Sequence, residues 1–168
     1  QSLLSEASII PSGSPDEVGA SQYLGALRQT TMRAVKSVEL MIGVIGATGE
    51  QLHPASYYTA TPSGGGGGSY VWDASADKAT ATAGDIIDPS VSLALQGTGV
   101  GLGCWVLSES GTLCLKQFGA IGDGVADDSD SLLLAGESGR SIAAKDGVFL
   151  IDAVVFTGTV DIIIYSSA

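Results

Sequence analysis

The chain has 168 residues, of which 45% are hydrophobic and 15% charged, so it can bury a core and is too apolar for wholesale disorder. Its formal net charge is −11, with 7 basic against 18 acidic residues, which excludes an electrostatic attraction to nucleic-acid phosphates or anionic membranes. The 24 glycines favour turns and close backbone contacts over long helices.

The N-terminal part predicts a helix. Ser14-Pro15-Asp16-Glu17 combines a Ser with a Glu three positions later and a Pro at the first helical position. Small and apolar residues then recur at alternating spacings of three and four: Leu24, Leu27, Thr31, Ala34, Val38 and Met41. This stripe has two interpretations, the seam of a helical trimer or one amphipathic helix packed on its own domain.

The middle of the chain has a β pattern after a short helical piece expected at Ser37–Ile42. The run Gly64–Gly68 has the composition of a flexible linker, but aromatic segments of strand type flank it, so we expect a loop between two strands. Cys104 and Cys114 lie on either side of an expected hairpin that turns at Ser108–Gly111; free thiols are favoured, with a disulfide between them as the alternative. Strands are expected at Tyr57-Tyr58, Ser69–Trp72, Ile86-Ile87, Val91–Leu95, Gly103–Leu107 and Thr112–Gln117.

An acidic, glycine-containing run follows this β region. Gly122 and Gly124 suit a turn with positive φ angles, and either Asp127 or Asp128 can cap a helix at Ser131–Ala135 that breaks at Gly136. Together with Asp123 and Asp130 these carboxylates also suit acid–base chemistry or a hard cation. Their spacing matches neither an EF-hand loop nor the glycine-rich calcium repeat, so we favour the structural role.

The last third predicts short strands separated by small or polar residues, the pattern of stacked solenoid rungs. A chain that begins with Gln and stops on an apolar strand is expected to be one part of a longer polypeptide. The expected strands are Ser141–Ala144, Val148–Ile151, Ala153–Phe156 and Val160–Tyr165, with a turn at Lys145–Gly147.

No residue pattern predicts a catalytic centre, a metal site or a cofactor. His53 is the only histidine, with no nearby Cys for zinc and no Gly-x-Ser-x-Gly motif for a catalytic triad. The alternating glycines at Gly97–Gly103 lack the spacing of nucleotide-binding loops. Trp72 and Trp105 can stack on sugars, but aromatics at strand spacing are more often core residues. No secretory signal or membrane span is evident.

Three segments carry a family resemblance. Cys114–Asp130, continued by Lys145–Ile151, resembles the start of a right-handed parallel β-helix of the pectate-lyase superfamily. Ser37–Leu107 is similar to the small domain that precedes the β-helix in many bacteriophage tailspikes and polysaccharide depolymerases. Residues 9–29 resemble a tail-attachment segment.

The resemblance implies a mainly β fold with an N-terminal helix, in which a small β-rich domain precedes the cap and first rungs of a right-handed parallel β-helix. The expected divisions are an attachment segment at 1–36, the small domain at 37–112 and the truncated β-helix at 113–168.

By the same resemblance the chain is the virion-anchoring part of a tailspike. It would be a homotrimer made in the host cytoplasm, docked on a phage tail or adaptor protein. Host polysaccharide would be bound or cleaved by positions beyond Ala168. Two alternatives stay open, the cap of a pectate-lyase-like polysaccharide lyase or glycoside hydrolase and a purely structural tail-fibre component.

Overall fold

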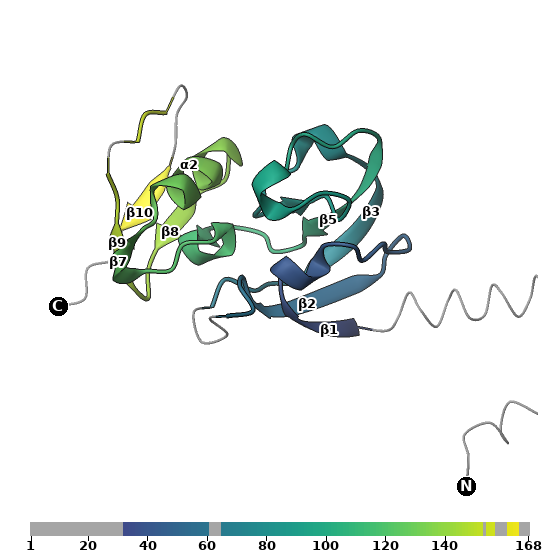
Figure 1. Cartoon of the computed structure of the whole chain (residues 1–168), viewed down its shortest axis with the longest axis horizontal. Helices are drawn as coiled ribbons and strands as arrows, with labels where there is room; N and C mark the ends of the chain where they lie inside the picture. Colours follow the sequence, from purple (N-terminus) through teal and green to yellow (C-terminus); the bar gives the residue numbers. More distant parts are fainter. Residues whose placement is uncertain (1–31, 61–64, 153, 157–160, 165–168) are drawn as a thin grey trace, which may run out of the picture.

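A five-stranded sheet forms the first half of the structure. The computed structural model describes residues 32–60, 65–152, 154–156 and 161–164. The strand order is β1-β2-β3-β5-β4, with β1 parallel to β2 and the other pairs antiparallel (Figure 1). The strands are β1 (Met32–Ser37), β2 (Gln51–Ser56), β3 (Tyr70–Asp77), β4 (Ile86–Ile87) and β5 (Leu102–Leu107), with short 3-10 helices η2 (Glu39–Met41), η4 (Lys78–Thr80) and η5 (Leu93–Leu95) between them.

The second half contains two parallel ladders and one α-helix. One ladder has the order β10-β8-β6 and the other pairs β7 with β9, so successive passes of the chain lie over one another. Figure 1 shows this group beside the five-stranded sheet, with α2 against it. The elements are β6 (Leu113–Cys114), η6 (Leu115–Phe118), β7 (Asp123–Asp127), α2 (Ser129–Glu137), β8 (Ile142–Ala144), β9 (Val148–Leu150) and β10 (Ile162–Ile164).

One hydrophobic core joins the two halves. Phe118 of η6 is 1% exposed and lies so close to Gly84 that a Cβ there would be 2.1 Å from the Phe118 ring. The hydroxyl of Tyr70 donates a hydrogen bond to the carbonyl of Gly84 at 2.6 Å, and Tyr57 donates to Ala83 at 2.5 Å. The same cluster of buried side chains extends from Trp105 in the sheet to the parallel ladders. The halves are therefore packed as one body.

The predicted helical stripe is wrong where the structure describes it. Ala34 lies exposed in strand β1, while Val38 and Met41 are fully buried in the core of their own chain. Pairing of β1 with β2 overrides the helical spacing. The predicted boundary between the attachment segment and the small domain, after residue 36, therefore falls inside strand β1. Leu24 and Leu27, like Thr31 and the predicted helix start, lie outside the described residues.

Other predicted elements also differ. Tyr57-Tyr58, expected as a strand, lie beyond the end of β2, and the second half of the strand expected at Thr112–Gln117 belongs to the 3-10 helix η6. The expected hairpin between Gly103–Leu107 and Thr112–Gln117 is wrong because β5 pairs with β3 and β4, whereas β6 pairs with the distant β8. The predicted strand at Val91–Leu95 contains the 3-10 helix η5 instead.

Helix α2 is longer than predicted and passes through Gly136, where a Cβ would be 2.3 Å from the ring of Phe156. This glycine makes room for a packed aromatic side chain and does not end the helix. The prediction of a loop between strands at Gly64–Gly68 is correct for its described part, since β2 and β3 pair on either side of it. Among the described residues no helix is long and apolar enough to cross a membrane.

Candidate functional site

The acidic run lies at the junction of the two halves, and its buried carboxylate is Asp128. This side chain is 2% exposed. Its two oxygens accept hydrogen bonds from the backbone N–H groups of Ile121 at 2.7 Å and Gly122 at 3.2 Å. Asp128 is the N-cap residue of α2, but its side chain makes no capping bond to the helix. It instead holds the backbone of Ile121 and Gly122, directly before β7. Gly122 and Gly124 have φ angles of +67° and +76°, but Gly124 lies inside β7, so the predicted glycine turn runs into a strand.

The exposed carboxylates of this run bind neighbouring backbone groups. Asp123 accepts hydrogen bonds from the N–H groups of Ala126 and Val125, both at 2.8 Å, and these contacts lower the pKa of its carboxyl. Asp127 accepts from the hydroxyl of Ser129 at 2.5 Å and from its N–H at 2.9 Å, which likewise lowers the pKa of Asp127. The Ser129 N–H belongs to the first residue of α2, so Asp127 is the acid that satisfies the helix start.

This arrangement is unsuited to general acid catalysis. A general acid near neutral pH needs a raised carboxyl pKa, whereas the pKa values of Asp123 and Asp127 are lowered. Within the described part of the chain, no group of three or more His, Cys, Asp or Glu side chains is placed to hold a metal ion. Three carboxylates of the run, Asp123, Asp127 and Asp128, accept hydrogen bonds from backbone N–H groups of the junction.

His53 forms a pair with a serine that the sequence did not predict. Its Nδ1 lies 2.9 Å from the hydroxyl oxygen of Ser69. The other ring nitrogen, Nε2, is buried and has no hydrogen-bond partner. A catalytic triad needs a carboxylate on the second nitrogen to orient the ring, so this pair lacks that third member.

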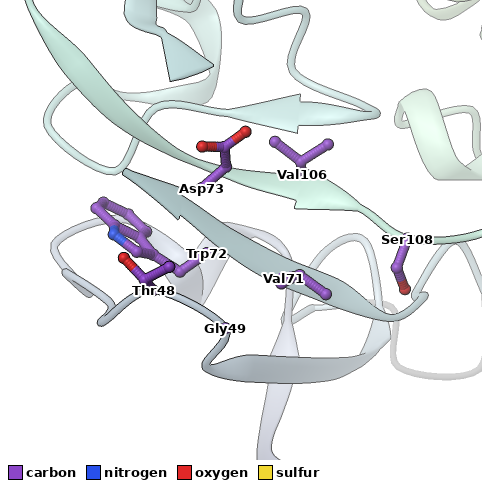
Figure 2. A pocket seen from close by; sticks show the side chains of 7 residues that line it. All are labelled: Thr48, Gly49, Val71, Trp72, Asp73, Val106 and Ser108. Carbon is purple, nitrogen blue, oxygen red and sulfur yellow. The ribbon is translucent and has the colours of Figure 1, made fainter. Parts of the chain in front are cut away.

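An apolar hollow of about 420 Å³ lies on the five-stranded sheet, and Figure 2 shows the side chains around it. Val71 and Val106 are cross-strand partners on β3 and β5, with Asp73 beside them. Trp72 is only 7% exposed and packs edge-on against Trp105 at a centroid distance of 5.2 Å. Because the indole belongs to the core, it offers little ring face for stacking on a sugar.

A second, polar hollow of about 510 Å³ lies between the glycine run and the junction. Three consecutive glycines, Gly65, Gly66 and Gly67, form one wall. A Cβ on Gly66 would be 2.0 Å from the carbonyl oxygen of Lys116, and one on Gly67 would be 2.1 Å from that of Pro54. The backbone itself is therefore pressed against η6 and strand β2. The other lining residues are Glu109, Thr112, Cys114, Lys116, Gln117, Lys145 and Asp146.

Gln117 connects the walls of this polar hollow. Gln117 is buried, with an exposed fraction of 5%. Its Nε2 donates to the carboxylate of Glu109 at 2.8 Å and to the carbonyl of Gly67 at 3.2 Å, while its Oε1 accepts from the N–H of Cys114 at 2.7 Å. Sequence reasoning missed this site, because its residues come from three separate segments. The signal that was available is the glycine run, whose length exceeds what a simple strand connection requires.

No family model and no curated protein matches the chain. Its fold, a small sheet continuing into stacked parallel strands, is that of phage tailspike proteins. One solved relative in fold is the enzymatically active domain of tailspike protein 2 of bacteriophage CBA120. That domain is 20% identical, has a TM-score of 0.57, and matches 87% of this chain and 18% of its own.

A second similar structure is tailspike protein gp49 of the Acinetobacter baumannii bacteriophage Fri1, described as a capsular polysaccharide depolymerase. It is 21% identical, with a TM-score of 0.59, and the match covers 79% of this chain and 23% of gp49. The chain thus spans about a fifth of the length of the tailspikes it matches. At these identities the likeness is one of fold.

Proposed function

We propose that this chain is the N-terminal, virion-anchoring part of a phage tailspike. The observation that carries the proposal is the shared core at Phe118, which packs the small sheet and the stacked parallel strands as one body. Phage tailspikes have this combined fold over most of the chain's length. A sheet rigidly joined to a growing stack suits a part that transmits orientation from a phage tail to a host-binding domain.

The parallel ladders are, in this proposal, the first rungs of a right-handed parallel β-helix. Further rungs would bind or cleave host surface polysaccharide, as the depolymerase named among the structural relatives acts on a capsular polysaccharide. The protein would be made in the host cytoplasm, assemble as a homotrimer, and dock on a tail or adaptor protein through its N-terminal segment, residues 1–36. Asp123, Asp127 and Asp128 bind the backbone of the junction, and the proposal assigns any polysaccharide chemistry to the further rungs.

Detection of the chain in purified virions tests the proposal. Antibodies raised against residues 32–164 should label phage tails in immunogold electron microscopy. Chemical cross-linking of the particle-borne protein should give trimers. Absence of the chain from virions would overturn the anchoring role, and a particle-borne monomer would overturn the homotrimer.

A further inference from the structure

The polar hollow beside Gln117 has no part in the proposed anchoring, although its walls are held in place by hydrogen bonds. We propose that it binds an acidic sugar unit, a hexuronate, of the host surface polysaccharide. The inference rests on the proposed function for the source of the sugar. The site itself is argued from the charges and contacts of the described residues.

Two basic side chains without partners line this hollow. Three other described cations have partners, because Arg33 pairs with Glu50 at 2.7 Å, Lys78 pairs with Asp88 at 3.4 Å, and Arg140 donates to backbone carbonyls. Among the described residues, the remaining basic side chains, with no hydrogen bond or ion pair, are Lys36, Lys116 and Lys145. Two of these three line the same hollow, so a carboxylate that enters it can meet two cations, beside the carboxylates of Glu109 and Asp146.

The walls of the hollow are already in position. Gln117 ties Glu109 to the glycine wall through the two bonds of its Nε2. Arg140 holds the loop of Glu109 by donating to the carbonyl oxygens of Glu109 at 2.7 Å and Gly111 at 3.3 Å. Because these groups need no ordering when a ligand arrives, the entropy cost of binding is reduced.

The lining also provides what a sugar needs besides a counter-charge. A volume of about 510 Å³ lies within the range of small-molecule sites, roughly 300–1,000 Å³. Glu109 and Asp146 can accept hydrogen bonds from ring hydroxyls, while Lys116 and Lys145 can donate to the carboxylate. A hexuronate combines one carboxylate with several hydroxyls and so fits both sets of groups.

The test is an NMR titration of the isotopically labelled 168-residue chain with sodium glucuronate, glucose and sodium acetate at fixed pH and ionic strength. We expect glucuronate to shift the amide signals of Gly65, Gly66, Gly67 and Thr112 saturably, with a dissociation constant on the order of 1 mM. Glucose and acetate should each shift them far less. The absence of a saturable shift, or equal shifts from glucose or acetate, would overturn the proposal.

Matched variants separate the site from general charge attraction. The double variant Lys116→Gln/Lys145→Gln should bind glucuronate about tenfold more weakly, with unchanged amide signals in the five-stranded sheet. Lys36→Gln removes the third unpartnered cation, outside the hollow, and should bind like the parent chain. Unaltered binding by the double variant, or equal weakening by Lys36→Gln, contradicts the site. If virions carry the chain but the chain does not bind glucuronate, only this site is refuted. If the chain binds glucuronate but is absent from virions, only the anchoring role is refuted.

Discussion

Replacing Phe118 by alanine tests whether the two halves are one cooperative unit. Phe118 lies in η6, at the start of the second half, yet its ring packs against Gly84 of the five-stranded sheet. Phe118 is only 1% exposed, so Phe118→Ala leaves a cavity in the shared core. Core substitutions of this kind cost about 3–5 kcal/mol of unfolding free energy. That loss is a large part of the roughly 5–15 kcal/mol by which domains are stable.

Urea unfolding followed by tryptophan fluorescence measures this effect in the sheet. Both tryptophans, Trp72 and Trp105, lie in β3 and β5 and so report on the first half of the molecule. With a denaturant slope of about 2 kcal/mol per M, the expected loss lowers the urea midpoint by about 1.5–2.5 M. Circular dichroism should give the same midpoint, because one core unfolds in one transition.

The control is Val125→Ala, since Val125 lies in the second half and is 80% exposed. This variant should change stability by less than about 0.5 kcal/mol. If Phe118→Ala left the tryptophan transition in place while the circular dichroism signal shifted, the halves would unfold independently. The shared core, and with it the rigid junction, would then be refuted.

Three further predictions concern single side chains. Asp128→Ala removes the acceptor of two backbone N–H groups and should lower the unfolding free energy by about 2–4 kcal/mol in urea titrations, whereas the exposed Asp130→Ala should change it by less than about 0.5 kcal/mol. The pKa of Asp127 is lower in the folded state than in the unfolded chain, so its contribution to stability is present above the unfolded pKa of about 3.9 and is lost as the pH falls through the folded value. The urea midpoint of Asp127→Asn should therefore vary less between pH 6 and pH 3 than that of the parent chain. An unchanged pH dependence would contradict this. Burial raises the pKa of Cys104 to about 11, so at pH 8 only about one Cys104 thiol in a thousand is thiolate. A disulfide reagent should therefore label the half-buried Cys114 first. Equal labelling rates for Cys104 and Cys114 would contradict this.

The sequence predicted the fold where local residue types decide the structure. The aromatic flanks of the glycine run indicated a loop between two strands, and the aliphatic segments at 142–144 and 148–150 were expected as strands. It failed at Met32–Ser37, where partner strand β2 decides the conformation. Ala34 continues a helical spacing with Val38 and Met41, which lie at and in the 3-10 helix η2, but pairing with β2 makes the segment around Ala34 a strand.

The candidate site was harder to predict because its contacts join distant segments. Asp128 was one of two candidates for the helix cap, but its oxygens accept hydrogen bonds from Ile121 and Gly122, which precede β7. Gln117 carried no signal in the sequence, since its importance lies in reaching both Glu109 and Gly67. Such bonds depend on how the chain folds back on itself, which residue types and local spacing do not encode.

The strand connections have a consequence for how fast the chain folds. Among the described strands, no two consecutive ones that pair with each other are joined by a tight turn; residues 57–69 separate β2 from β3, and residues 88–101 separate β4 from β5. The ladder of β6 with β8 likewise encloses η6, β7 and α2. Each of these pairings must close a long loop before any contact compensates for the lost chain entropy, and the described strands include no local hairpin that could nucleate the sheet. Refolding should therefore take milliseconds to seconds, with the pairing of β3 with β5 as its slow step.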